Sequence, residues 1–130
     1  MSQENVEIVR RFVDALERED LPAALACLDS ELEWIPRRAP IEGTYHGHDG
    51  FERYVAETNE HWEKFEIHTE LRDVGGRVLA WGTISVRGAG SGVEMEVPTA
   101  GVFDIRGGKI TRWHGFGSKA EALEAVGLSE

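Results

Sequence analysis

The chain has 130 residues, of which 41% are hydrophobic and 29% charged, a balance typical of one soluble domain spanning residues 1–130. Its 24 acidic and 14 basic residues give a formal net charge of −10, which disfavours binding to nucleic acid and to anionic membrane surfaces. No apolar leader follows Met1, and no apolar run approaches the roughly 18 residues of a membrane span, so we expect a cytoplasmic protein. The single cysteine, Cys27, lies on an apolar helical pattern and is expected to be a small buried side chain.

The first part of the chain has the spacing of amphipathic helices. Apolar residues recur at intervals of three and four from Val6 to Leu16, with Ser2 as a candidate cap. Asp20 then precedes a second, shorter helical pattern with Pro22 in its first turn, where a missing N–H costs nothing. The sequence therefore predicts two consecutive helices before residue 30.

A short strand and a third helix follow. Residues 32–36 alternate and end at Pro36, which is typical of a strand cut off by proline. Residues 37–47 are rich in Arg, Pro and Gly and predict a loop. A helical pattern then runs from His48 or Asp49 to about Lys64. Its predicted inner stripe is Phe51, Tyr54, Val55, Thr58 and Trp62.

From residue 65 the hydrophobic period changes to two, which predicts strands at 65–71, 78–87 and on both arms of a long hairpin at 93–117. Glycine-rich reversals at 74–77, 88–92 and 106–109 separate these strands. Ser118 is expected to cap a final helix at 119–125. Helices grouped on one side of a mainly antiparallel sheet predict an α+β fold. Because such a sheet is strongly curved, we expect a cone-shaped α+β barrel enclosing a pocket under the N-terminal helices.

The order of these segments resembles the SnoaL-like branch of the nuclear transport factor 2-like superfamily, over essentially the whole chain. The resemblance implies the cone-shaped fold. It does not imply one activity, because the superfamily holds isomerases, cyclases, epoxide hydrolases, dehydratases and non-catalytic binders. The segments that carry it are Phe12–Leu16 through Glu19–Leu21, Leu32–Trp34, Tyr45–Phe51, Gly107–Ile110 and Ala120–Leu128.

The resemblance also locates the positions at which related enzymes place their catalytic residues. In the ketosteroid isomerase pattern, Phe12, Gly101 and Pro36 stand where a tyrosine and two aspartates act. In the SnoaL cyclase pattern an aspartate follows a His-Trp pair on the last strand, and Gly115 stands there. No Asp–Arg–Asp set of the limonene epoxide hydrolase kind can be placed. The resemblance therefore leaves the activity unassigned.

Aromatic residues from four predicted elements would converge inside the barrel. They are interpreted either as core packing or as the lining of a cavity for a flat apolar ligand. Gly82, Gly101 and Gly115 at inward strand positions favour the cavity, because each removes side-chain volume. The predicted ligand-binding residues are Trp34, Tyr54, Thr58, Trp62, Thr99, Phe103 and Trp113.

Three residues are candidate proton carriers should the protein be an enzyme: Glu33, Glu96 and His114. Strand alternation turns Glu96 away from the cavity when Thr99 faces it, unless a β-bulge near Pro98 reverses the order. By the same alternation, His114 faces away when its neighbour Trp113 faces inward.

No metal site and no cofactor are predicted. The spacing of His46, His48 and Glu52 resembles half of a cupin metal set. Glu52, however, falls on a predicted helix rather than on a strand. The run Gly88-x-Gly90-x-Gly92 joins two strands and lacks the following helix that a dinucleotide loop needs.

Three functional hypotheses remain. The first is a protein that binds a small apolar molecule, of unassigned activity. The alternatives are an acid–base enzyme of the polyketide cyclase, isomerase or hydrolase kind, and a non-catalytic dimerisation or interaction module. Trp81 and Phe116 are predicted on the convex sheet face, where large apolar residues indicate a homodimer.

Overall fold

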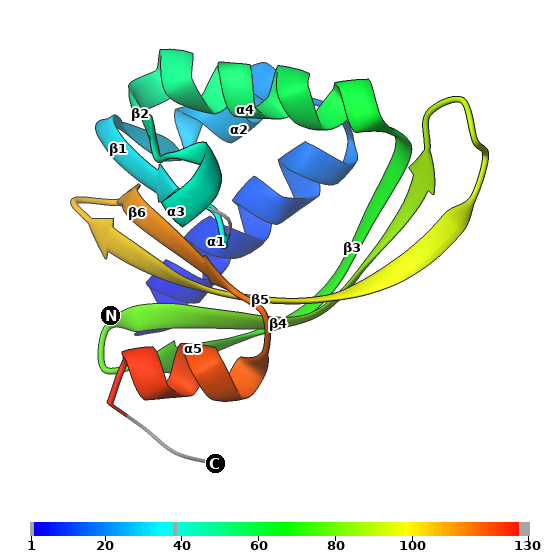
Figure 1. Ribbon diagram of the computed structural model, residues 1–130. Coiled ribbons are helices and arrows are strands. Elements are labelled where there is room, and N and C mark those ends of the chain that lie inside the picture. The colour runs from blue at the N-terminus through cyan, green and yellow to red at the C-terminus, as the bar shows by residue number, and fades with distance from the viewer. Residues whose placement is uncertain (1, 38, 128–130) are drawn as a thin grey trace.

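The computed structural model describes residues 2–37 and 39–127. Helices lie near both ends of the chain and between its first strands, and the strands form a long, curled sheet (Figure 1). The elements are α1 Ser2–Glu17, α2 Leu21–Ala26, β1 Leu28–Ile35, α3 Ala39–Glu42, β2 Tyr45–His46, α4 Gly47–His61, β3 Trp62–Val74, β4 Arg77–Gly88, β5 Glu94–Arg106, β6 Lys109–Phe116 and α5 Lys119–Ala125.

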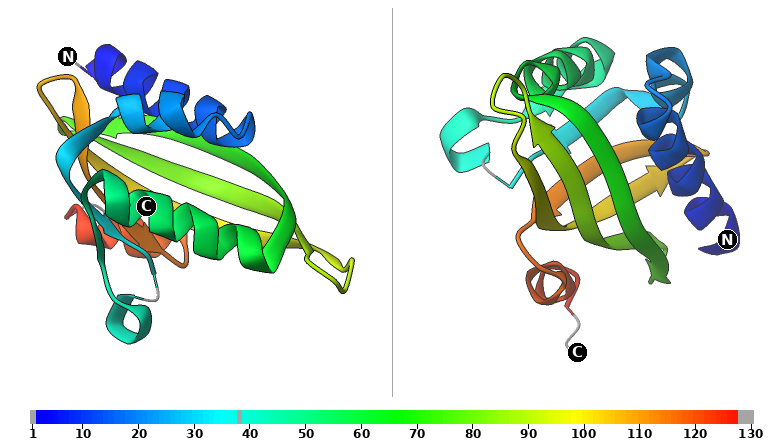
Figure 2. Two further views of the ribbon diagram at one scale, coloured as in Figure 1. Left: turned by 90° about the horizontal axis from the view of Figure 1, so that it is seen from above. Right: turned by 90° about the vertical axis from the view of Figure 1, so that its right-hand side faces the viewer.

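The strands form one six-stranded sheet in the order β2-β1-β6-β5-β4-β3. Strands β1 and β6 pair in parallel, and the other pairs of described strands are antiparallel. The sheet curls around a hollow that α1, α2 and α4 cover, while α5 lies against the opposite, convex face (Figures 1 and 2). The predicted α+β cone with helices packed on a curved, mainly antiparallel sheet is confirmed.

Local sequence signals determine where several elements begin and turn. Asp20 Oδ1 accepts a hydrogen bond of 3.1 Å from the Ala23 N–H, which caps α2 as predicted. Ser118 caps α5 through the Glu121 N–H in the same way. The turn between β5 and β6 has φ values of +59° and +78° at Gly107 and Gly108, and positive φ at two consecutive residues is what a tight two-residue hairpin requires.

Three boundaries differ from the predictions. Helix α4 ends at His61, and Trp62 has extended backbone angles and begins β3, so the helix predicted to reach Lys64 is too long. Residues 37–47 are not one loop, because they contain α3 and β2. Strand β1 begins at Leu28, four residues before the predicted start.

Two apolar clusters lie on the two faces of the sheet. The larger one joins the helices to the concave face and includes Phe12, Trp34 and Phe51. The smaller one joins α5 to the convex face, where Trp81 and Phe116 pack beside the buried Leu123. The chain's own last helix thus covers part of the apolar surface from which the homodimer is predicted.

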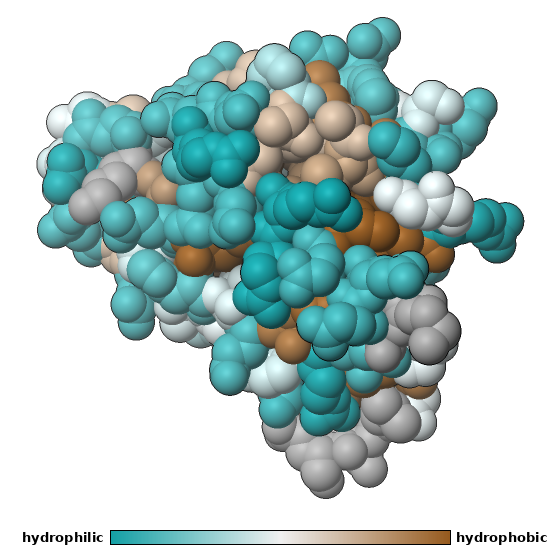
Figure 3. Space-filling view, turned by 180° about the vertical axis from the view of Figure 1, so that it is seen from behind, coloured by the Kyte–Doolittle hydropathy of each residue, from teal (hydrophilic) through white to brown (hydrophobic). Residues whose placement is uncertain are grey.

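The outside of the molecule is mainly polar. Seen from behind, hydrophilic side chains cover most of the surface, and hydrophobic atoms are visible in smaller areas between them (Figure 3). None of the described helices is long and apolar enough to cross a membrane.

Candidate ligand-binding cavity

The hollow of the cone is a cavity of about 1850 Å³. Its walls come from α1, α4, the end of β1 and the inner faces of β3 to β6. The structure brings all seven predicted ligand-binding residues into this lining, although Trp62 does so from the start of β3 rather than from a helix. They are Trp34, Tyr54, Thr58, Trp62, Thr99, Phe103 and Trp113.

The closed end of the cavity is a cluster of aromatic rings. The indoles of Trp34 and Trp113 are stacked, with ring centroids 4.2 Å apart and planes 23° apart. Phe51 meets the Trp34 ring edge-on at 4.9 Å, and Tyr54 lies 5.5 Å from it. Offset-stacked and edge-on rings pack favourably, so these side chains serve both as core and as the floor of the cavity. The two interpretations of the aromatic residues are therefore compatible.

The inward-facing glycines do not leave empty space next to this floor, contrary to the prediction. A Cβ at Gly101 would lie 2.2 Å from Trp113 Nε1, and one at Gly115 would lie 2.5 Å from another atom of the same ring. The two glycines therefore make room for the Trp113 indole, which lies across them. Gly82 has a different role, because a Cβ there would lie 2.0 Å from the backbone oxygen of His68 on β3. The open space lies beyond the indole, where Thr69, Thr99 and Ile84 continue the lining.

A polar pair that sequence reasoning missed also lines the cavity. The Tyr45 hydroxyl donates a 2.5 Å hydrogen bond to Glu57 Oε1. Tyr45 is only 8% exposed, whereas Glu57, on α4, is exposed. The helical pattern contained a signal for Glu57, because positions 54, 57, 58 and 61 share one face of α4.

Two of the candidate proton carriers lie outside the cavity. Glu33 is on the exposed side of β1 and forms an ion pair of 3.1 Å with Arg112. Glu96 is exposed on β5, and the β4–β5 register runs without a shift from Val78 to Arg87. The bulge near Pro98 that would have turned Glu96 inward is therefore absent from this strand pair. Neither carboxylate belongs to the cavity lining.

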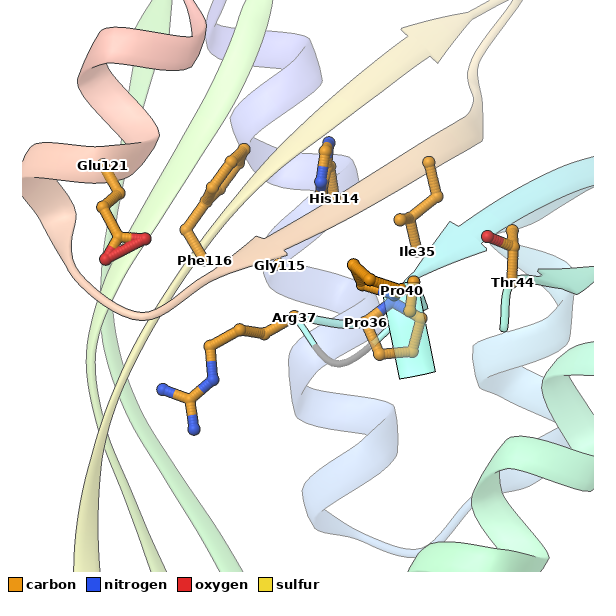
Figure 4. A pocket seen from close by; sticks show the side chains of 10 residues that line it. Ile35, Pro36, Arg37, Pro40, Thr44, His114, Gly115, Phe116 and Glu121 are labelled. Carbon is orange, nitrogen blue, oxygen red and sulfur yellow. The ribbon is translucent and has the colours of Figure 1, made fainter. Parts of the chain in front are cut away.

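His114 lines a second, smaller cavity of about 410 Å³ on the other face of β6 (Figure 4). Its ring stacks on Phe116 at 4.4 Å, and the Arg37 side chain extends away from it. Burial lowers the pKa of His114 below its ordinary 6.5, and the positive charge of Arg112 lowers it further, while Glu33 opposes the shift. These effects favour the neutral form of His114, which lines the smaller cavity, whereas Trp34 and Trp113 line the larger one.

The described residues contain no group of three or more His, Cys, Asp or Glu side chains placed to hold a metal ion. His48 Nε2 lies 2.9 Å from the Leu28 carbonyl oxygen, which ties the start of α4 to β1. Cys27 is half-buried, and burial raises the pKa of its thiol above the ordinary value despite the nearby charges of Arg11 and Lys109.

Comparison with known proteins agrees with this geometry. The SnoaL-like domain matches residues 9–113, which is most of the chain. The chain belongs to the SnoaL-like domain family. Its sequence has no significant match among curated proteins.

Solved structures of the same fold cover almost the whole of this SnoaL-like chain. A nuclear transport factor 2-like protein of unknown function from Burkholderia pseudomallei is 26% identical, with a TM-score of 0.80 over 95% of this chain and 97% of its own. Another from Burkholderia xenovorans is 27% identical, with a TM-score of 0.76 over 96% of each chain. A protein from Xanthomonas campestris, provisionally named a polyketide cyclase, is 21% identical with a TM-score of 0.78 over 88% and 90%. At that identity the likeness shows the fold alone.

Proposed function

We propose that this SnoaL-like protein binds an apolar small molecule containing a flat ring system in the cavity of the cone. The observation that carries the proposal is the convergence of ring side chains from β1, α4, β5 and β6 on one hollow of about 1850 Å³. A concave site lined by aromatic and other apolar side chains, with polar groups at particular points, is the usual form of a small-molecule site, and the aromatic floor of this cavity fits that form. Thr58 and Thr99 add hydroxyl groups to the wall.

Binding is favoured over acid–base catalysis because of where the ionisable groups lie. The floor residues Phe12, Trp34, Phe51, Phe103 and Trp113 have no group that transfers a proton near neutral pH. Glu33, Glu96 and His114 are on other surfaces of the sheet. An enzyme of the cyclase, isomerase or hydrolase kind remains the alternative, with the hydrogen-bonded Tyr45–Glu57 pair as a candidate for the proton transfer.

A matched pair of substitutions tests the binding proposal. Thr99→Phe places a ring in the cavity, whereas Thr83→Phe places the same ring on the neighbouring strand facing the other way. The neutral fluorescent probe N-phenyl-1-naphthylamine reports occupancy of an apolar site by its emission. We expect Thr99→Phe to weaken probe binding by at least about tenfold, the equivalent of roughly 1.4 kcal/mol. Thr83→Phe should bind the probe as the wild type does. Equal affinity for all three proteins, or no binding by the wild type, would refute the proposal.

We also propose a homodimer that uses the convex sheet face. Trp81 and Phe116 stay partly exposed after packing beside α5, and Lys119 Nζ covers the Trp81 ring at 4.4 Å. The test is sedimentation velocity on wild type, Ser85→Arg on the convex face and Asn59→Arg on α4. A dimer that only Ser85→Arg weakens supports the proposal, and a wild-type monomer at all concentrations contradicts it.

A further inference from the structure

We propose that the ligand of the cavity carries a positive charge, such as that of a protonated amine, and holds it at the open rim while its apolar body lies on the aromatic floor. This inference rests on the proposed function, because it names the chemical class that the same site selects. It follows from how charge is distributed along the cavity wall.

The rim of the cavity is strongly acidic. Seven lining residues have a carboxylate side chain, whereas the described basic side chains in the lining are Arg37 and His61. Basic side chains lie near three of these carboxylates, since Arg18 is 3.4 Å from Asp20, Arg87 is 4.0 Å from Glu63 and His68 is 3.9 Å from Glu66. The acidic residues nevertheless outnumber the basic ones, and the chain as a whole has a net charge of −10. The acidic lining residues are Glu17, Glu19, Asp20, Glu57, Glu60, Glu63 and Glu66.

These carboxylates come from two sides of the opening. One group lies at the end of α1 and in the turn before α2, and the other at the end of α4 and the start of β3. Helices α1 and α4 both lie over the concave face of the sheet, on two sides of the hollow (Figure 2). A charged group at the rim would therefore have negative charge on both sides of it. Charge of one sign around a cleft with low-dielectric walls concentrates the field inside the cleft.

The helix dipoles act in the same direction. The last residues of α1 and of α4, among them Leu16 and His61, belong to the lining, so both helices direct their C-terminal ends toward the cavity. A helix C-terminus carries the equivalent of about half a negative charge and favours cations within its last turn. Two helices of 16 and 15 residues thus add to the negative potential of the rim independently of its side chains.

Some of the rim carboxylates already have partners. Glu57 accepts from Tyr45, Glu17 accepts from the Ile67 N–H at 3.2 Å, and Asp20 caps α2. Glu19 and Glu60 are exposed and have neither a hydrogen bond nor an ion pair with another described residue. These two side chains are therefore available to a ligand cation without losing an existing bond. Trp62, next to this rim, adds an aromatic side chain of the kind whose face attracts cations.

Three naphthalene compounds of similar size test the charge preference: 1-naphthylmethylamine (cationic), 1-naphthalenemethanol (neutral) and 1-naphthoate (anionic). Their affinities for the full chain are measured by isothermal titration calorimetry at neutral pH. We expect the amine to bind about tenfold more tightly than the anion, with the alcohol between them. The preference should fall in 1 M salt, where the Debye length is only about 3 Å.

Two double variants separate the rim from the net charge of the protein. Glu19→Gln with Glu60→Gln removes two charges at the rim, and Glu7→Gln with Glu124→Gln removes two exposed charges elsewhere. We expect the rim variant to lose most of the amine preference while its affinity for the alcohol is unchanged. The control variant should keep that preference.

The outcomes distinguish this inference from the proposed function. If the alcohol binds the wild type and binds Thr99→Phe more weakly, but the amine binds the wild type no more tightly than the anion does, the cavity site stands and the cation inference is overturned. An equal loss of amine preference in both double variants would also overturn it, because net charge alone would then explain the effect. If none of the three compounds binds, the proposed function fails and the inference fails with it.

Discussion

The contact between Gly101 and the Trp113 indole makes a quantitative prediction about packing. A Cβ at position 101 would lie 2.2 Å from Trp113 Nε1, whereas ordinary contact begins near 3.4 Å, so Gly101→Ala requires the ring to retreat by about 1.2 Å. The ring cannot retreat freely, because its other face is stacked on Trp34 at 4.2 Å. Overpacking of this kind typically costs about 1–3 kcal/mol, and we expect Gly101→Ala to lower the free energy of unfolding by that amount.

Removing the ring should reverse the sign of the effect. The backbone at Gly101 does not have the positive φ that disfavours alanine, and its three nearest Cβ contacts all belong to Trp113. In a Trp113→Ala background, Gly101→Ala should therefore stabilise the protein by about 0.4–1 kcal/mol, because alanine restricts the unfolded chain. The double-mutant cycle should give an interaction energy near the upper end of the roughly 0.5–3 kcal/mol seen for contacting residues.

Urea unfolding of the four proteins, followed by circular dichroism, measures this cycle. Gly82→Ala is the matched control, because its Cβ would meet the His68 backbone oxygen at 2.0 Å and its φ is +153°. Its cost should be the same with or without Trp113. Were Gly101→Ala equally destabilising in both backgrounds, or neutral in the wild type, the indole would not lie across Gly101 as described.

Three further predictions concern single sites. Because the pKa of His114 is lowered in the folded state, the unfolded chain takes up the proton first as the pH falls below about 6.5, and the folded state loses stability in that range. His114→Gln should therefore show a smaller fall in Tm between about pH 7.5 and 5 than the wild type. An equal or larger fall would contradict the lowered pKa. Cys27 should react with a thiol reagent more slowly at neutral pH in the native protein than in urea, because burial raises its pKa, and equal rates would exclude this. Asp20→Ala and Ser118→Ala should each lower the free energy of unfolding by about 1 kcal/mol through loss of a helix cap, and urea unfolding without a change in either variant would mean that the caps do not contribute.

Features set by neighbouring residues were predictable from the sequence. The Asp20 and Ser118 caps and the Gly107–Gly108 turn depend on hydrogen bonds or backbone angles within four residues, and the structure has all three. The side-chain alternation of β5 was also predictable, because no bulge interrupts its pairing with β4. Once Val97 and Thr99 face the cavity, Glu96 has to face away from it.

Features that depend on distant contacts were not predictable in the same way. The parallel pairing of β1 with β6 joins residues such as Trp34 and Trp113, which are far apart in the chain. This pairing extends β1 back to Leu28, and β2 pairs with the other edge of β1. The early end of α4 has a similar origin, since Trp62 pairs with Gly88 on β4 and is drawn into the sheet. Helical periodicity alone carried no information about that partner.

The candidate site combines both kinds of information. The alternation of side chains along β5 and β6 correctly grouped Thr99, Phe103 and Trp113 on one face of the sheet. It also led to the expectation of open space at Gly101 and Gly115, which the Trp113 ring fills. A large ring leans along its strand and across to the next one, so a glycine two residues away and a glycine on the partner strand mark where the ring lies. The stacked Trp34 and Trp113 then hold the inward face of β1 and β6 in place, which leaves Glu33 and His114 outside. Charge near a ligand must therefore come from the helix ends and the open strand ends at the rim, where most of the charged residues in the lining are acidic.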